Sequence, residues 1–178
     1  FVATEEYKRR VIQLGENPAA VFNVGAPGVD AIKNAQFLSK KELERDLKIK
    51  FNKHNLLAVF HPATLHTNDS PQKQFKELHS ALDELKDTNI IFFKPNADTN
   101  GRIISKMIDD YVSSNPQKAK FFTSIGHLKY LSLMRFVDTI IGNSSSGISE
   151  APSFKIGTIN VGDRQKGRVK AESIIDCD

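Results

Sequence analysis

The chain alternates short runs of β-branched and aromatic residues with longer amphipathic stretches. Such runs predict strands, and apolar residues recurring every three or four positions predict helices. The expected strands cover residues 1–4, 21–24, 56–60, 89–93, 120–123, 137–141, 158–161 and 173–176. Because most of them are separated by helical stretches, parallel pairing through right-handed crossovers is expected. The pattern therefore predicts an α/β fold, a Rossmann-like parallel sheet with helices on both faces.

The helix after residue 70 is the most clearly marked. Asp69 or Ser70 can cap it, and Pro71 suits a first helical turn. Its expected apolar face consists of residues three or four positions apart, Phe75, Leu78, Leu82 and Leu85. The sequence predicts a helix from this point through the whole apolar face.

Other helices are expected over residues 5–14, within the lysine-rich stretch 36–53, and in two later stretches. Asn100 is a candidate cap for the first of these later helices. The expected apolar faces are Ile104, Ile108 and Tyr111 in that helix, and Leu128, Leu131 and Met134 in the second. The segment Gly25-Ala26-Pro27-Gly28 is expected to interrupt regular structure as a hinge or linker.

Polar residues follow the predicted strands at the end where a parallel sheet binds ligands. In open α/β sheets the ligand lies beyond the carboxyl ends of the strands. The polar residues there are His61, Asn96, Ser124, Ser144 to Ser146, and Arg164. This coincidence is the strongest argument from the residues alone for a binding site at that edge.

The run from Gly142 to Glu150, Gly-Asn-Ser-Ser-Ser-Gly-Ile-Ser-Glu, is the most informative part of the chain. It follows an apolar strand and is expected to open a short helix. Backbone N–H groups and the positive end of a helix dipole would then converge on an anion. Glu150 is placed to accept hydrogen bonds from sugar hydroxyls beside a phosphate. The working hypothesis is a nucleotide-diphosphate site.

Other interpretations of this run fit less well. Gly142 and Gly147 have the spacing of a Walker loop, but Ile148 stands where that loop needs lysine. The serines do not fall in the G-x-S-x-G frame of a nucleophile elbow. A serine-rich turn that only caps a helix stays open as an alternative. Three consecutive hydroxyls between glycines, followed by a carboxylate, exceed what a cap requires, so the anion site is favoured.

Composition indicates an ordinary globular protein, with 39% hydrophobic and 26% charged residues. No apolar run approaches the roughly 20 residues that span a bilayer, and no secretory signal is visible. The single cysteine, Cys177, excludes an internal disulfide and fits a reducing cytoplasm. We therefore expect a cytoplasmic protein without a membrane partner.

The net charge of +4 is modest, and the basic residues are spread along the chain. A long basic stripe interleaved with aromatics would support a nucleic-acid partner better, so none is expected. His61, His66 and Asp69 have no common zinc spacing and no cysteine support, so no metal is expected either. The charge suits a small polyanionic ligand equally well.

Six segments together carry a family resemblance over nearly the whole chain. They are residues 1–7 (Phe-Val-Ala-Thr-Glu-Glu-Tyr), 22–30, 61–64 (His-Pro-Ala-Thr), 94–98 (Lys-Pro-Asn-Ala-Asp), 142–150 and 158–168. In this order they resemble the hydrolysing UDP-N-acetylglucosamine 2-epimerases. The resemblance is closest to the branch that makes N-acetylmannosamine for sialic acid, or a related bacillosamine-derived sugar for legionaminic acid.

The resemblance implies two facing Rossmann-like domains, the GT-B arrangement, with the active site between them. Residues 1–26 would be the tail of the N-terminal domain and the hinge. Residues 27–178 would be the UDP-binding C-terminal domain, incomplete at its C-terminal end. The acid and base carboxylates are expected to precede Phe1, so the chain by itself is expected to be inactive. We expect the full-length protein to be a homo-oligomer.

The reaction that the resemblance implies eliminates UDP from the nucleotide sugar and hydrates the glycal-type intermediate. It releases the 2-epimeric free sugar and UDP and needs no cofactor. On this resemblance His61 is the catalytic residue, near the diphosphate and the departing oxygen. The implied UDP-binding residues are Ser144, Ser145, Ser146, Gly147, Glu150, Arg164 and Asn96. The residues alone leave open that His61 caps a strand end and that Arg164 is a surface cation.

Two other function classes remain open. A GT-B glycosyltransferase shares the fold and a ribose-binding glutamate but transfers the sugar to an acceptor. The runs 143–147 and 163–168 favour the epimerase over the transferase. A non-catalytic module that binds nucleotides or nucleic acid is the third possibility.

Overall fold

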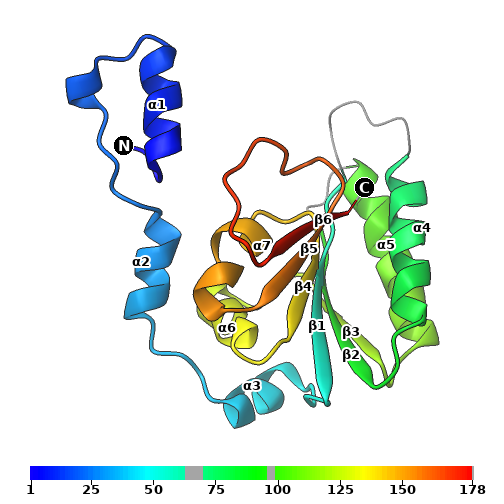
Figure 1. Ribbon diagram of the computed structural model, residues 1–178. Coiled ribbons are helices and arrows are strands. Elements are labelled where there is room, and N and C mark those ends of the chain that lie inside the picture. The colour runs from blue at the N-terminus through cyan, green and yellow to red at the C-terminus, as the bar shows by residue number, and fades with distance from the viewer. Residues whose placement is uncertain (63–69, 96–98, 178) are drawn as a thin grey trace.

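The computed structural model describes residues 1–62, 70–95 and 99–177. Its main body is a sheet with the strand order β3-β2-β1-β4-β5-β6, all neighbours pairing in parallel (Figure 1). The strands are β1 (His54–Val59), β2 (Thr88–Phe93), β3 (Ala119–Phe122), β4 (Thr139–Gly142), β5 (Gly157–Val161) and β6 (Ile174–Cys177). The strand order reverses between β1 and β4, which is where ligands bind in such sheets. The predicted Rossmann-like α/β fold is confirmed.

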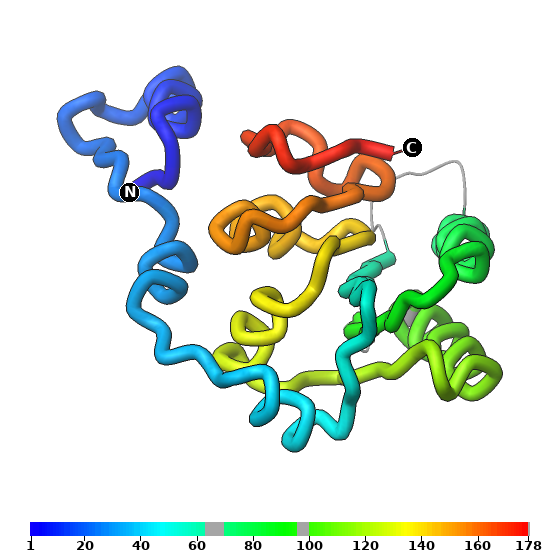
Figure 2. The backbone as a smooth tube through the Cα atoms, turned by 60° about the horizontal axis from the view of Figure 1, so that its bottom comes forward, coloured from blue at the N-terminus to red at the C-terminus, as the bar shows by residue number. Residues whose placement is uncertain are grey.

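Helices cover the sheet unequally on its two sides. The helices are α1 (Glu5–Gln13), α2 (Pro27–Asn34), α3 (Lys40–Leu47), α4 (Pro71–Asp83), α5 (Thr99–Ser114), α6 (His127–Met134) and α7 (Ser146–Ser149), with 3₁₀ turns at Pro18–Ala20 and Ala151–Phe154. Figures 1 and 2 show α4 and α5 on one side of the sheet and α6 and α7 on the other. None of the helices within the described ranges is long and apolar enough to cross a membrane.

Alternation along the strands divides the buried residues into two cores. Leu57 and Val59 of β1 point into a core formed with α3 and α6. Leu56 and Ala58, the intervening residues, point into the core under α4 and α5. Both sides of β1 are therefore buried, which explains why the central strands are continuously apolar.

Helix α1 lies apart from the sheet, whereas α2 buries Ile32 in the core beside it. No residue of α1 is buried, and its contact with the body includes two hydrogen bonds to the loop between β5 and β6. Arg10 Nη1 donates to the Gly167 carbonyl at 2.8 Å, and the Val169 amide donates to Tyr7 Oη at 3.1 Å. Figure 2 shows α1 and α2 leading along the side of the sheet before the chain enters α3.

The structure corrects several local expectations near the N-terminus. The strands expected over 1–4 and 21–24 form only an isolated bridge between Val2 and Asn23. The segment expected to be a linker instead begins α2 at Pro27, whose ring fits a first helical turn. The lysine-rich helix within 36–53 is shorter than that stretch and forms α3, which Ser39 and Glu42 cap reciprocally.

Helix boundaries differ from expectation further along as well. Ser70 caps α4, accepting a hydrogen bond from the Lys73 amide, whereas Asp69 lies outside the described residues. Asn100 is inside α5 rather than its cap. Leu85 lies beyond the end of α4 and Leu128 faces outward, and both are exposed because neither contacts a core. The other expected face residues of these helices are buried.

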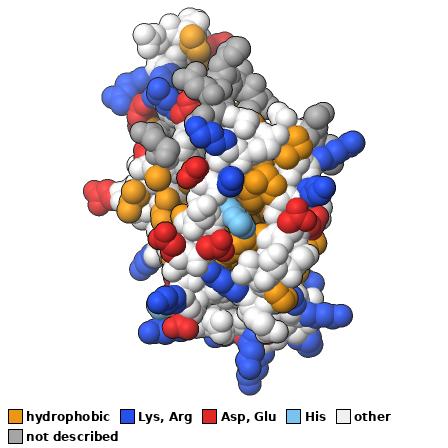
Figure 3. Space-filling model, turned by 90° about the vertical axis from the view of Figure 1, so that its right-hand side faces the viewer, with side chains coloured by type: hydrophobic (Ala, Val, Ile, Leu, Met, Phe, Trp, Pro, Cys, Tyr) orange, Lys and Arg blue, Asp and Glu red, His pale blue; other side chains and the backbone are white. Residues whose placement is uncertain are grey.

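The outer surface of α4 and α5 carries charges of both signs. Figure 3 shows lysine and arginine side chains interspersed with acidic ones around a patch of hydrophobic side chains. This face therefore has no extended field of one sign.

Candidate anion site at the ends of β1, β4 and β5

Gly142, the last residue of β4, allows the chain to turn tightly against β1. Its φ is +129°, and a Cβ atom there would lie 2.1 Å from the Val59 carbonyl oxygen. A backbone atom in a central strand cannot move aside, so only glycine fits this position. The turn that follows is thereby held directly beside the end of β1.

Asn143 ties three loops together. Its side chain is buried and pairs with the backbone of His61 in both directions, accepting from the amide and donating to the carbonyl at 2.7 Å each. Its carbonyl accepts from Arg164 Nη1 at 2.9 Å and Gln165 Nε2 at 2.8 Å. The residues that follow β1, β4 and β5 therefore meet around one asparagine, at the edge where a Rossmann-like sheet binds ligands.

The three serines after Asn143 are half-buried. Among the described residues, the backbone N–H groups of Ser144 and Ser145 donate to no protein acceptor. Helix α7 has a single turn, so its dipole is small and the expected dipole contribution is correspondingly weak. An anion at this turn would instead meet the two amides, the serine hydroxyls and the nearby Arg164 guanidinium.

Gly147 fastens the serine turn to β5. A Cβ atom at this position would lie 2.7 Å from Thr158 Cγ2. The Thr158 hydroxyl donates to the Gly147 carbonyl at 2.8 Å in a fully buried contact. The glycine thus serves close packing and accepts a specific hydrogen bond, rather than lining an open loop.

Glu150 lies at the far end of α7 and is half-buried. Burial raises the pKa of its carboxyl above the ordinary value, and the positive charge of His127 opposes that rise. Gly28, in the first turn of α2, is close enough that an added Cβ would lie 3.8 Å from Glu150 Oε1. The carboxylate is therefore enclosed between α2 and α6, partly shielded from water.

Tyr130 of α6 contacts the serine turn, although nothing in the sequence indicated it. Its hydroxyl lies 2.6 Å from Ser146 Oγ, and its ring packs edge-on against Phe93 with centroids 5.0 Å apart. Burial raises the pKa of Tyr130 to about 12, so the phenol is protonated at neutral pH. The apolar face expected for this helix, Leu128, Leu131 and Met134, did not include Tyr130.

The structure brings together most of the residues predicted from the sequence. His61, Arg164 and Ser144 all lie within one residue or one hydrogen bond of Asn143. Ser124 is exposed, and its hydroxyl accepts only a long bond from the Gly126 amide, 3.5 Å. Asn96 lies outside the described residues, as do His66 and Asp69.

Sequence reasoning missed Asn143, Gln165 and Tyr130. The first two carry hydrogen bonds between residues about 20 and 80 positions apart, for which no local pattern exists. In the described ranges, histidine, cysteine and acidic side chains form no group of three suited to a metal ion.

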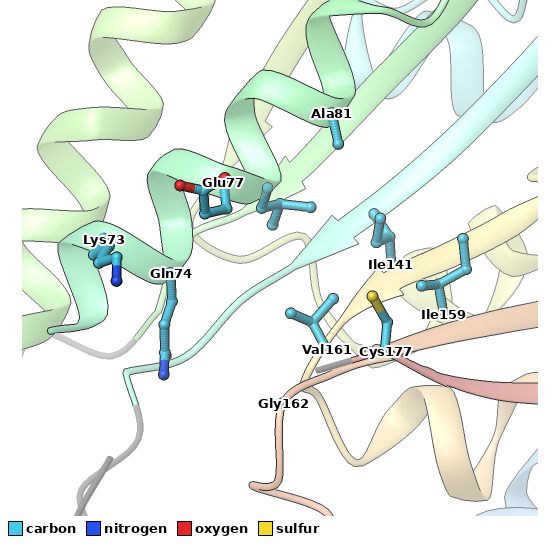
Figure 4. A pocket seen from close by; sticks show the side chains of 10 residues that line it. Lys73, Gln74, Glu77, Ala81, Ile141, Ile159, Val161, Gly162 and Cys177 are labelled. Atoms are coloured by element: carbon cyan, nitrogen blue, oxygen red, sulfur yellow. The ribbon is translucent and has the colours of Figure 1, made fainter. Parts of the chain in front are cut away.

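A separate apolar groove of about 290 Å³ lies on the opposite face of the sheet (Figure 4). Its floor is formed by Ile141, Ile159 and Val161, and α4 forms one wall. Cys177 of β6 also points into it. The groove contains none of the predicted site residues and lacks the convergent polar groups of the Asn143 junction.

Comparison with known proteins places this chain in a family. The sequence profile described as UDP-N-acetylglucosamine 2-epimerase matches residues 1–178. A GDP/UDP-N,N'-diacetylbacillosamine 2-epimerase (hydrolyzing) of Campylobacter jejuni is 48% identical over 178 residues, covering 100% of this chain and 46% of the relative. The polysialic acid biosynthesis protein P7 of Escherichia coli is 43% identical over 180 residues, covering 99% and 44%.

A solved structure shows the same fold. The UDP-GlcNAc 2-epimerase of Methanocaldococcus jannaschii, in complex with UDP-GlcNAc and UDP, superposes with a TM-score of 0.77 at 24% identity, covering 99% of this chain and 49% of that one. The chain spans less than half the length of the curated relatives it matches. The match along all 178 residues shows that the chain belongs to the UDP-N-acetylglucosamine 2-epimerase family.

Proposed function

We propose that the chain is the UDP-binding half of a hydrolysing nucleotide-sugar 2-epimerase. The observation that carries this proposal is the junction around Asn143, which gathers His61, Arg164 and the serine turn at one edge of the sheet. A diphosphate needs several donors that are already in place, because donors oriented in advance need no reorganisation when charge develops. The named relatives, hydrolysing 2-epimerases, support the same reaction class.

In the proposed reaction UDP leaves from C1 of the sugar while the proton at C2 is removed, and water then adds to the unsaturated intermediate. The charge that develops on the departing phosphate oxygen is stabilised by the Ser144 and Ser145 amides and by Arg164. His61, fixed through its backbone by Asn143, assists departure of that oxygen. Glu150 accepts hydrogen bonds from the ribose hydroxyls. Asn96, outside the described residues, is proposed as a UDP-binding residue on the family resemblance alone.

The sugar in this proposal is an N-acetylated hexosamine. The products are UDP and either N-acetylmannosamine or a related diacetamido sugar. Support comes from the relatives named for diacetylbacillosamine in Campylobacter jejuni and Legionella pneumophila, and from the UDP-GlcNAc 2-epimerase of Neisseria meningitidis. We place the enzyme in the cytoplasm as a homo-oligomer.

The division into domains is also proposed. Residues 1–26 form the tail of the N-terminal domain and the hinge, and residues 27–178 belong to the C-terminal domain. Phe1, Phe22 and Val24 are exposed, and α1 buries none of its residues in the described chain. Such apolar exposure fits a segment that packs on a domain preceding it. The acid and base carboxylates would come from that domain, which makes the 178-residue chain inactive by itself.

The deciding experiment uses the complete protein that carries this chain. It is incubated separately with UDP-N-acetylglucosamine, the UDP-linked diacetamido sugar and its GDP-linked counterpart, without an acceptor, and the released sugar is identified by NMR. Release of UDP together with the 2-epimeric free sugar is expected. Turnover only when an acceptor is added would identify a glycosyltransferase and overturn the proposal.

The assignment of the anion site has its own test. Ser145 has a φ of −64°, which proline also adopts, so Ser145→Pro removes the amide donor with little change at that residue, whereas Ser145→Ala removes only the hydroxyl. We expect the proline variant to lose about tenfold or more in UDP affinity by calorimetry, and the alanine variant less. Ser153→Ala, an exposed serine in the following 3₁₀ turn, is the matched control. Equal affinities in all three would remove the site assignment.

A further inference from the structure

Three hydroxyl groups form a chain from the protein interior to the proposed phosphate site. Tyr130 Oη lies 2.6 Å from Ser146 Oγ, and Ser146 Oγ lies 3.3 Å from Ser144 Oγ. The Ser146 amide also donates to Ser144 Oγ at 3.3 Å. Distances alone do not say which hydroxyl donates, but the available partners do.

Tyr130 must donate to Ser146. Among the described residues its hydroxyl has Ser146 as its only hydrogen-bond partner, so accepting from Ser146 would leave the phenolic proton without an acceptor. A phenol is also more acidic than an alcohol and is the stronger donor. Burial keeps the pKa of Tyr130 near 12, so the proton is present throughout the neutral range.

The direction of the hydrogen bond from Tyr130 determines the direction of the hydrogen bond between the two serines. Ser146 Oγ accepts from Tyr130, and the hydroxyl partner within reach of its own proton is Ser144 Oγ. Ser144 Oγ then accepts from both the hydroxyl and the amide of Ser146, which fills both of its lone pairs. Its own proton is the one group left, and Ser144 therefore presents a donor to whatever binds at the turn.

We propose that Tyr130 is a positioning residue that orients the Ser146 and Ser144 hydroxyls so that Ser144 is a committed hydrogen-bond donor to the diphosphate. This inference rests on the proposed function and deepens it, because it explains how a neutral hydroxyl distinguishes an anion from other ligands. The short bond to Tyr130 fixes Ser146, and hydrogen bonds in such a chain polarise one another in the same direction. The rigid support is the ring of Tyr130, which is held against Phe93.

The test compares UDP with uridine, which lacks the diphosphate, by calorimetry and competition on the complete protein. Tyr130→Phe should weaken UDP binding about three- to tenfold and leave uridine within about twofold. On a Ser144→Ala background the same substitution should have no further effect on UDP. Tyr111→Phe is the matched control, because that hydroxyl is buried in the core on the other face of the sheet and should change neither affinity.

Each outcome decides between the alternatives. Tyr130→Phe could instead weaken UDP and uridine binding equally, or weaken UDP binding equally in the wild-type and Ser144→Ala proteins. Either result would show that Tyr130 supports only the fold and would overturn the inference. Should Tyr130→Phe fail to fold, Ser146→Ala interrupts the same chain, and wild-type UDP affinity there would overturn it too. Wild-type protein that does not bind UDP overturns the proposed function itself. UDP binding by the wild type that Tyr130→Phe leaves unchanged overturns only the role of Tyr130.

Discussion

The two sides of β5 contrast in an unusual way. On the side that faces α7, the polar residues Thr158 and Asn160 are almost completely buried, at 3% and 1% exposure. On the other side, the apolar residues Ile159 and Val161 are partly exposed and line the groove beside α4. This inverts the usual distribution, in which strands bury apolar side chains and expose polar ones.

The polar side of β5 holds the candidate site in place. Thr158 bonds to Gly147, and the Asn160 amide bonds to Asp176 Oδ1 of β6 at 2.7 Å and, more weakly, to the Gly162 carbonyl. These hydrogen bonds are directional and start from buried side chains, so they fix the position of α7 and of the loop after β5 more precisely than apolar contacts would. The serine turn, which leads into α7 and is tied to that loop through Asn143, is therefore held in a defined position as well.

The apolar side of β5 is only partly covered in the described part of the chain, because Ile159 and Val161 pack against the core under α4 and α5 but stay half-exposed. Parallel sheets normally have both faces covered, and β1 follows that rule whereas β5 and β6 do not. Ile175 of β6 is 67% exposed although it aligns with Ile159 on this face. The candidate site therefore depends on the polar side of β5, and paired substitutions on the two sides can compare what each contributes to stability and to UDP binding.

The largest effect is expected at the turn that begins the site side. Gly142→Ala would place a Cβ atom against the Val59 carbonyl and force a left-handed φ on a residue with a side chain. We expect a loss of about 4 kcal/mol or more in the free energy of unfolding, measured by urea denaturation. The control is Gly126→Ala, where φ is also positive but an added Cβ meets nothing within 4 Å. Comparable losses at both positions would show that φ strain alone matters, not the close approach of β1 and β4.

A smaller but still large effect is expected at Asn143. Asn143→Ala leaves the buried backbone groups of His61 without their two partners, at an expected cost of about 2–4 kcal/mol. UDP affinity of the folded variant should also fall, because His61 and the serine turn lose the residue that holds them together. The comparison variant is Asn17→Ala, which removes an exposed asparagine whose side chain caps the 3₁₀ turn after α1. Wild-type UDP affinity in Asn143→Ala would show that the hydrogen bonds around Asn143 do not contribute to UDP binding.

The contrast within β5 is tested by a pair of conservative substitutions. Thr158→Val keeps the shape of the side chain but leaves the Gly147 carbonyl unpaired in a buried position, with an expected cost of about 1–3 kcal/mol. Ile159→Val removes one methyl group from the groove side and should cost less than about 1 kcal/mol. UDP affinity should fall only in Thr158→Val. If Ile159→Val is the more destabilising of the two, the groove side contributes more to stability than its exposure indicates.

The sequence predicted those features that depend on residues close together in the chain. The strands of the sheet and the Ser70 cap of α4 were predictable because their patterns repeat within a few residues. The position of the serine turn was predictable for the same reason. By contrast, the two N-terminal strands did not form, because strand propensity without a neighbouring sheet stabilises at most a bridge.

The parts of the site that escaped prediction depend on contacts between distant residues. Asn143 and His61 are separated by 82 positions, and the need for glycine at 142 arises from Val59 in another strand. Tyr130 lies outside the apolar face expected for α6, and only the fold shows that its hydroxyl meets Ser146. The sequence therefore indicated the residues proposed to bind UDP, whereas the residues that hold them in position became visible only in the fold.

The smallest expected effect is the change that ionisation of Glu150 makes to the free energy of unfolding as the pH varies. Because burial raises the pKa of this carboxyl, the protonated form is the better accommodated one in the folded protein. Its contribution to stability is fully present below the unfolded value of 4.5 and is lost as the pH rises through the higher folded pKa. The loss should be under about 1 kcal/mol, since the group is partly solvated.

UDP binding should depend on pH in the opposite direction. In the proposed site the ribose hydroxyls donate to the ionised carboxylate. Affinity should therefore fall as the pH drops through the raised pKa of Glu150, and ionisation of Glu150 on binding should release protons in that range. Glu150→Gln removes the titrating group while keeping an acceptor oxygen. This variant should make the free energy of unfolding less dependent on pH. It should also lower UDP affinity by about threefold to tenfold at neutral pH. His127→Asn is the companion variant, because it removes the charge that opposes the shift and should raise the pKa of Glu150 further. The terminal phosphate of UDP titrates in the same range, so the wild type is compared with Glu150→Gln. Identical pH profiles of UDP affinity in the two proteins would show that the Glu150 carboxylate does not contact the nucleotide.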